Sequence, residues 1–178
     1  MKKKIAILGS TGSIGENTLK IIKKDKKSFD VNLLTTNKNI NKIFKQAKEF
    51  KVKNIIISDL SSYRKAKIKF KKSKVKIFNN YDHFHKILKN KNDLVMSSIT
   101  GLNGLSPTLK SIKYTKKILI ANKESIICGW NLIEKELKKY KTKFIPVDSE
   151  HFSIWSLLQN YNSTNIEKIF ITASGGPF

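Results

Sequence analysis

Short apolar runs alternate with segments of helical periodicity along almost the whole chain. This alternation predicts repeated strand–helix–strand units, because parallel strands need a crossover connection that is usually a helix. We therefore expect an α/β fold: a Rossmann-like, mostly parallel sheet with helices on both faces. The expected strands cover residues 4–8, 30–36, 52–57, 74–78, 93–98, 117–120, 143–145 and 166–172.

A glycine-rich turn joins the first expected strand to the first expected helix. Residues 9–15 read Gly-Ser-Thr-Gly-Ser-Ile-Gly and lie between the apolar run 4–8 and the helical segment 16–22. This order suits a dinucleotide, because glycines let a pyrophosphate approach and the helix start offers free N–H groups. The spacing G-x-x-G-x-x-G is not the commonest one, and a plain glycine turn is the alternative.

The end of the second expected strand indicates which dinucleotide would fit. NAD-binding proteins usually place an acidic residue there, whereas this chain has Thr36, Asn37, Lys38 and Asn39. The lack of a carboxylate favours NADP(H), since Lys38 and its polar neighbours can meet a 2′-phosphate. The alternative is a simple loop that caps the following helix.

Residues 121–125, Ala-Asn-Lys-Glu-Ser, follow the expected strand 117–120 and open a helical segment. Ligands of open α/β sheets bind at the carboxyl ends of strands, so Lys123 and Glu124 are candidate ligand contacts. An ordinary helix start, with Asn122 as the N-cap and Glu124 in the first turn, is the alternative.

Residues 146–151, Pro-Val-Asp-Ser-Glu-His, follow the last strand before a further helical segment. At an extended strand end, Asp148 and Glu150 would point to the same side, because they are two residues apart. Two converging carboxylates suit a hard divalent cation such as Mg²⁺ or Mn²⁺. Alternatively, Asp148 or Ser149 is a helix N-cap and Glu150 lies in the first turn.

The net charge of +23 raises the question of a nucleic-acid partner. Lysines are spread over nearly the whole chain, and Arg64 is the only arginine. Proteins that read DNA sequence usually depend on arginine forks, so we expect no specific nucleic-acid partner. The positive charge would instead help to attract a phosphorylated substrate.

The single cysteine, Cys128, excludes an internal disulfide and a cysteine-based metal site. It lies in an apolar run and is expected to pack as a small hydrophobic residue. No apolar stretch approaches the length of a bilayer span, and the start lacks the pattern of a signal peptide. We expect a cytoplasmic protein without a membrane partner.

Four motifs together resemble the 1-deoxy-D-xylulose 5-phosphate reductoisomerase family. They occur in the order of residues 9–15, 121–125, 146–151 and 174–178, the last reading Ser-Gly-Gly-Pro-Phe. Taken alone, Ser-Gly-Gly can cradle an anion or form an ordinary turn. The joint occurrence of the four motifs is far more specific than any one of them.

The resemblance implies an NADPH-binding domain over residues 1–145 and the beginning of an α/β catalytic domain over residues 146–178. It implies conversion of 1-deoxy-D-xylulose 5-phosphate to 2-C-methyl-D-erythritol 4-phosphate with NADPH and Mg²⁺ or Mn²⁺, Co²⁺ being a further option. It also implies a homodimer. Because family chains continue beyond Phe178 and supply another metal-binding glutamate there, residues 1–178 alone are expected to be inactive.

The resemblance also assigns residues to roles, position by position. Lys123 and Glu150 would be catalytic, and Asp148 and Glu150 would bind the metal. The substrate would contact Lys123, Ser149, Glu150 and Ser174. The residues that would bind NADPH are Thr11, Gly12, Ser13, Ile14, Asn37, Lys38, Asn39, Asn122 and Glu124. Asn37 and Ala173 depart from the glycines common in the family, and the role of His151 stays open.

Two other functions compete with this interpretation. Another NADP-dependent reductase of the same fold would need no metal, so its activity would not depend on Glu150. An inactive remnant would act at most as a basic binding module, with steep salt dependence and no saturable NADPH site.

Overall fold

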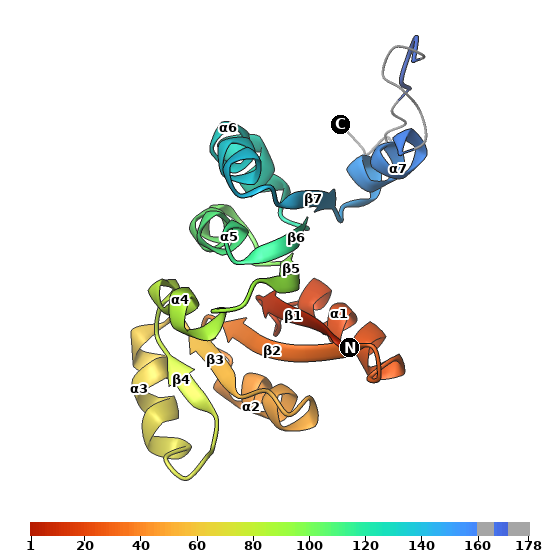
Figure 1. Cartoon of the computed structure of the whole chain (residues 1–178). Helices are drawn as coiled ribbons and strands as arrows, with labels where there is room; N and C mark the ends of the chain where they lie inside the picture. Colours follow the sequence, from red (N-terminus) through yellow and green to blue (C-terminus); the bar gives the residue numbers. More distant parts are fainter. Residues whose placement is uncertain (160–165, 171–178) are drawn as a thin grey trace, which may run out of the picture.

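The computed structural model describes residues 1–159 and 166–170. Seven parallel strands form one sheet with the order β4-β3-β2-β1-β5-β6-β7 (Figure 1). The expected mostly parallel Rossmann-like sheet is therefore confirmed. The strands are β1 (Lys3–Leu8), β2 (Phe29–Thr36), β3 (Asn54–Ile57), β4 (Lys76–Phe78), β5 (Asn92–Ser97), β6 (Thr115–Ile120) and β7 (Lys143–Pro146).

Helices connect consecutive strands, as the sequence pattern predicts. The α-helices are α1 (Ser13–Lys24), α2 (Ile40–Glu49), α3 (Leu60–Lys69), α4 (Phe84–Ile87), α5 (Leu105–Ile112), α6 (Lys123–Tyr140) and α7 (Ser149–Leu158). Two 3-10 turns, η1 (Tyr81–His83) and η2 (Leu102–Gly104), precede α4 and α5. Of the expected strand 166–172, residues 166–170 show no regular secondary structure, and residues 171 and 172 lie outside the described part.

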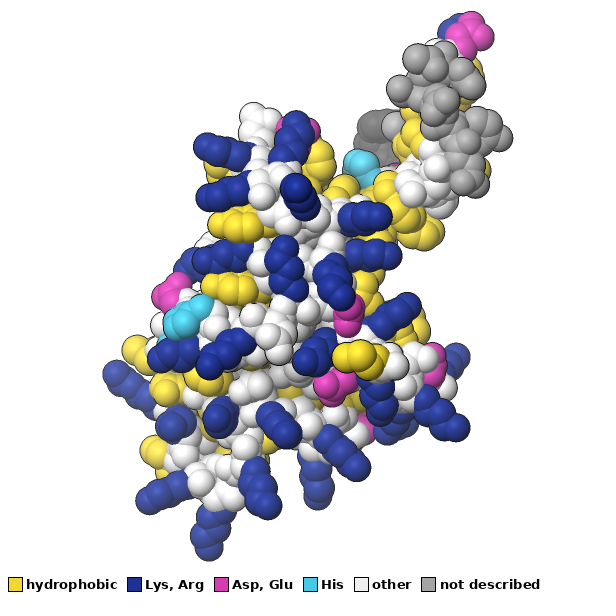
Figure 2. All heavy atoms as spheres, viewed as in Figure 1, with side chains coloured by type: hydrophobic (Ala, Val, Ile, Leu, Met, Phe, Trp, Pro, Cys, Tyr) yellow, Lys and Arg dark blue, Asp and Glu magenta, His cyan; other side chains and the backbone are white. Residues whose placement is uncertain are grey.

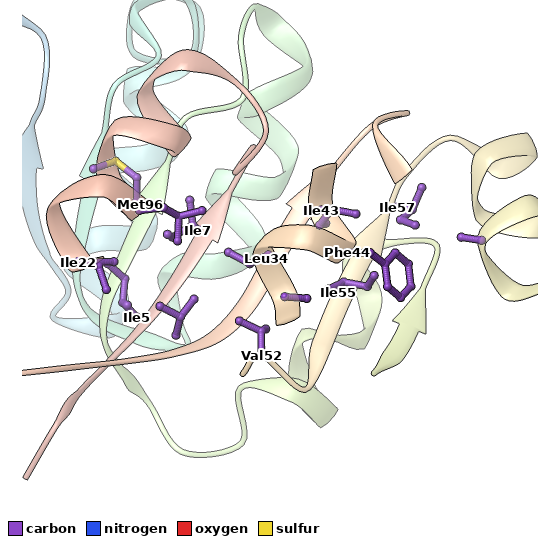
Figure 3. Packing of buried hydrophobic residues seen from close by; sticks show 14 residues of the cluster. Ile5, Ile7, Ile22, Leu34, Ile43, Phe44, Val52, Ile55, Ile57 and Met96 are labelled. Atoms are coloured by element: carbon purple, nitrogen blue, oxygen red, sulfur yellow. The ribbon is translucent and has the colours of Figure 1, made fainter. Parts of the chain in front are cut away.

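Two hydrophobic layers cover opposite faces of the sheet. In β1, Ile5 and Ile7 join the layer under α1, α2 and α3, shown in Figure 3. Ala6 and Leu8 join the other layer, under α4, α5 and α6. This alternation follows from the two-residue period of a strand, and it confirms helices on both faces.

A β-bulge interrupts this regular alternation in β2. Ile5 pairs with Val31 but Ala6 pairs with Leu33, so Asn32 has no partner in β1. Val31 and Leu33 consequently belong to opposite layers although they are two residues apart. The Asn32 side chain forms two hydrogen bonds with the buried Asn92 amide, of 2.7 and 2.9 Å.

The helices α6 and α7 differ in how many of their residues are buried. The buried residues of α6 recur every fourth position, at Ser125, Gly129, Ile133 and Leu137. Cys128 lies off this stripe and is exposed, so the expectation of a packed cysteine was wrong. In Figure 1, α7 lies beyond β7 at the end of the sheet, and none of its residues is buried.

Lysines dominate the outside of the molecule. Figure 2 shows lysine and arginine side chains over most of the visible face, with few acidic ones between them. This distribution agrees with the even spread of lysine along the sequence. Within residues 1–159 and 166–170, no helix has the length and apolar character that crossing a bilayer would require.

Candidate functional site

The glycine loop between β1 and α1 uses its glycines in different ways. Gly9 has a φ of +82°, and a Cβ there would lie 2.8 Å from the Ser98 carbonyl oxygen. A Cβ on Gly15 would lie 2.6 Å from the Ser10 Cα. The backbone therefore requires glycine at both positions. By contrast, a Cβ on Gly12 would meet only the Gly9 oxygen at 3.5 Å, an ordinary contact.

The start of α1 is open to an anion. Gly12 is the N-cap residue and has no side chain to pair with the first amides of the helix. Those amides lack partners within the helix and lie at the positive end of its dipole. Ser13 and Ile14 are exposed in this first turn, and Gly15 is buried behind them.

Polar side chains of β2 and α2 hold the loop in place, and sequence reasoning gave no role to Thr35 or Gln46. The Gly9 amide donates to Thr35 Oγ1 over 2.9 Å, and the hydroxyls of Thr11 and Thr36 are 2.7 Å apart. Two hydrogen bonds join the loop to α2, in which Ser10 Oγ donates to Gln46 Oε1 and Gln46 Nε2 donates to the Ser10 carbonyl. The pair of threonines at the carboxyl end of β2 was the available signal.

A cleft of about 600 Å³ lies at the carboxyl ends of the strands, in front of this loop. Three of the predicted cofactor residues, Thr11, Gly12 and Asn37, line it. Its other lining residues come mainly from the segments that follow β1, β2, β3 and β5. These are Gly9, Thr35, Thr36, Ser58, Tyr81, Ser98, Ile99, Thr100, Asn103, Ser106 and Pro107.

At the β2 end of the cleft, the three predicted residues have different surroundings. Asn37 Nδ2 donates to Ser58 Oγ over 2.9 Å. Asn39 is the N-cap of α2, and its Oδ1 accepts from the Lys42 amide. Lys38 is exposed between them. The cap interpretation therefore describes Asn39, while Asn37 lines the cleft.

Asn122 is the N-cap of α6 and is only 3% exposed. Its Oδ1 accepts from the Ser125 amide, and its Nδ2 donates to the carbonyls of Ile99 and Gly101. Both carbonyls belong to the loop after β5, which contributes to the cleft. Asn122 thus fixes the position of that loop, and Glu124 is exposed in the first turn of α6.

Asp148 and Glu150 do not lie on an extended strand end. Asp148 is the N-cap of α7, because its Oδ1 accepts from the His151 amide over 3.0 Å and pairs with His151 Nδ1 at 2.7 Å. Glu150 lies in the first helical turn. The expectation of strand geometry was wrong because the cap starts the helix at Ser149.

The second oxygen of Asp148 distinguishes it from an ordinary cap. The Asp148 side chain is 6% exposed, and its Oδ2 is buried without a hydrogen-bond partner among the described residues. A buried carboxylate oxygen without a partner is costly, and a cation is the usual compensation. Within the described ranges, no three histidine, cysteine or acidic side chains form a metal cluster. Asp148 therefore supplies a single oxygen suited to a cation.

Glu150 is paired with Lys123 across the gap between α6 and α7. Glu150 Oε2 accepts from Lys123 Nζ over 3.0 Å and from Ser149 Oγ over 2.9 Å. The Glu150 backbone amide, Lys123 and Ser149 lower the pKa of the Glu150 carboxyl to about 2. The same pairing raises the pKa of Lys123.

Ser174, which was predicted to contact the substrate, lies outside the described residues.

The Lys123–Glu150 pair should lose its stabilising effect at low pH. Because the Glu150 backbone amide, Lys123 and Ser149 lower the pKa of Glu150 from 4.5 to about 2, these interactions stabilise the fold fully above pH 4.5. That contribution is lost as the pH falls through about 2. NMR titration of the Glu150 carboxyl carbon should give a midpoint near pH 2, and Lys123→Met should raise it. A midpoint of 4.5 in the unsubstituted protein would contradict the pair.

The candidate residues gather at one edge of the sheet. The glycine loop follows β1, Lys123 follows β6, and Glu150 follows β7. Since the strands are parallel, their carboxyl ends share an edge, which is where open α/β sheets bind ligands. The arrangement can hold a phosphate-containing ligand at α1 and a cation near Asp148.

Comparisons with known proteins agree with this geometry. The family model for 1-deoxy-D-xylulose 5-phosphate reductoisomerase matches residues 5–129, and the model for the C-terminal domain of that enzyme matches residues 144–178. A reductoisomerase of this name from Pelagibacter ubique is 62% identical over 99% of this chain and 46% of its own length. One from Clostridium acetobutylicum is 40% identical, with the same coverage.

Solved structures of the same kind have the same fold. The reductoisomerase from Zymomonas mobilis in complex with NADPH has a TM-score of 0.82 and 31% identity, over 91% of this chain and 43% of that chain. A DOX-P reductoisomerase in complex with NADPH, fosmidomycin and magnesium has a TM-score of 0.81 and 32% identity, over 91% and 41%. The chain thus spans about half the length of the curated relatives it matches, 46%. It belongs to the 1-deoxy-D-xylulose 5-phosphate reductoisomerase family.

Proposed function

We propose that the chain provides the cofactor and metal sites of a reductoisomerase that converts 1-deoxy-D-xylulose 5-phosphate to 2-C-methyl-D-erythritol 4-phosphate. The observation that carries this proposal is the joint placement of an open helix start and a lone buried carboxylate oxygen on one sheet edge. When bound, NADPH supplies a hydride and a divalent cation supplies Lewis-acid polarisation.

The cofactor part of the proposal rests on the cleft in front of α1. Gly12, Ser13 and Ile14 would present backbone to the pyrophosphate, with Thr11 beside them. The residues near the adenosine end would be Asn37, Lys38 and Asn39. None of the described residues that line the cleft carries a carboxylate, which suits the 2′-phosphate of NADPH. Asn122 would serve the cofactor by holding the loop after β5, and Glu124 would reach it from the first turn of α6.

The metal part rests on Asp148. Its Oδ2 and the Glu150 carboxylate would hold Mg²⁺, the ion in the related magnesium complexes, or Mn²⁺. Lys123 carries the positive charge that would orient the phosphorylated sugar, with Ser149, Glu150 and Ser174 contributing. We further propose the division into domains 1–145 and 146–178, a homodimer and a cytoplasmic location, all from the family resemblance.

Calorimetric titration with NADPH and NADH tests the cofactor part. We expect saturable binding of one NADPH per chain, about tenfold tighter than NADH, because Lys38 can pair with the 2′-phosphate. Lys38→Gln should reduce this preference, whereas Lys53→Gln, at the opposite edge before β3, should not. Salt-dependent polyanion binding without a saturable NADPH site would favour a basic binding module instead.

A further inference from the structure

Tyr81 lies at the end of the cleft near β2 and β3, and it belongs to none of the four sequence motifs. It opens η1, three residues after the end of β4, and lines the cleft together with Thr35, Asn37 and Ser58. Those three residues follow or end β2 and β3. Tyr81 therefore lies in the part of the cleft beyond the end of β2, on the side away from α1.

The ring of Tyr81 is fixed in place by its surroundings. It packs edge-on against buried Phe84, with ring centroids 5.6 Å apart and an interplanar angle of 63°. The side chains of Thr35 and Ser58 lie within reach of its hydroxyl, and burial raises the pKa of the Tyr81 phenol. The phenol is therefore neutral at ordinary pH and can present an aromatic wall without a charge.

The order of groups in a bound dinucleotide would place the adenine base next to the Tyr81 ring. The pyrophosphate lies at the helix after the first strand, and the adenosine ribose lies at the end of the second strand. The base must then continue past β2, in the direction of β3 and β4. An aromatic ring at that place offers a stacking surface for a base.

We propose that Tyr81 is a binding residue for the adenine end of the dinucleotide. The inference rests on the proposed NADPH site and adds a residue that the family motifs do not contain. The aromatic ring provides the contact, and the hydroxyl lies near the side chains of Thr35 and Ser58. Tyr81 is thus a binding residue rather than a catalytic one.

Three variants test this role by titration with NADPH, adenosine 2′,5′-bisphosphate and reduced nicotinamide mononucleotide. Tyr81→Leu, which keeps bulk and removes the ring, should weaken the first two ligands about tenfold and leave the mononucleotide unchanged. Tyr81→Phe should stay within about threefold of the unsubstituted protein, since stacking is retained. Tyr114→Leu is the matched control, because Tyr114 packs on Phe84 but does not line the cleft.

The outcomes separate this inference from the function on which it rests. If the unsubstituted chain binds neither NADPH nor the bisphosphate, the proposed function fails and the role of Tyr81 fails with it. If both bind and Tyr81→Leu binds them equally well, only the role of Tyr81 is overturned. An equal loss in Tyr114→Leu, or in Tyr81→Phe, also overturns it, because packing or the hydroxyl would then explain the effect. Thermal unfolding of each variant checks that the fold is intact.

Discussion

Replacing Gly12 with alanine is expected to remove NADPH binding without unfolding the protein. The Gly12 backbone is extended, with φ −83° and ψ 169°, so alanine can adopt it. A methyl group there would touch only the Gly9 oxygen at 3.5 Å and otherwise occupy the cleft. It would block the approach of the pyrophosphate to the helix start. We expect an affinity loss of about hundredfold or more, measured by calorimetry.

Gly15→Ala is the contrasting variant in the same loop. Its new methyl group would overlap the Gly9 carbonyl and the Ser10 backbone, neither of which can rotate away. The free energy of unfolding should fall by about 2–3 kcal/mol, as for other overpacked sites. Chemical denaturation measures this loss. Equal stability losses in the two variants would contradict the distinction between a ligand-facing Gly12 and a packed Gly15.

Asp148→Asn should remove most of the stabilisation of the protein by a divalent cation. Asparagine is as good an N-cap as aspartate, so α7 should still begin at Ser149. The substitution removes the charge of the buried, unpaired oxygen, so Mg²⁺ affinity should fall by about hundredfold. At a Mg²⁺ concentration of 100 times the dissociation constant, the unsubstituted protein should gain about 2.7 kcal/mol.

Thermal unfolding with and without Mg²⁺ measures this difference without relying on turnover. Asp59→Asn is the matched control, because Asp59 is also a helix N-cap, accepting from the Ser62 amide over 2.8 Å, but it caps α3 rather than α7. Asp59→Asn should keep the full Mg²⁺ response. If Asp148→Asn also kept it, the metal site would have to lie elsewhere, while the NADPH proposal would stand.

Much of the fold was accessible from the sequence because strand and helix periods are local properties. The alternation of apolar runs predicted the parallel sheet, and the four motifs predicted the family. The bulge at Asn32 was not predictable, because an alternating pattern assigns Val31 and Leu33 to the same face. Only the pairing with β1 and the hydrogen bonds to Asn92 reveal that they face opposite layers.

The candidate site was predicted less completely than the fold. For Asp148, a cap and a metal ligand appeared as alternatives, whereas one oxygen makes the cap and the other has no hydrogen-bond partner among the described residues. A sequence cannot assign two oxygens of one side chain to separate tasks. Tyr81 was missed for a different reason, since its place beside Thr35 and Ser58 depends on contacts between distant segments.

The central position of β1 has a consequence for the order in which the protein can assemble during synthesis. β1 pairs with β2 on one side and with β5 on the other, and the cleft takes its walls from residues as far apart as Gly9 and Pro107. The glycine loop therefore leaves the ribosome long before its opposite wall exists. A nascent chain halted before β5 would contain the glycine loop but not the complete cleft. The edge of β1 that pairs with β5 would still be unpaired.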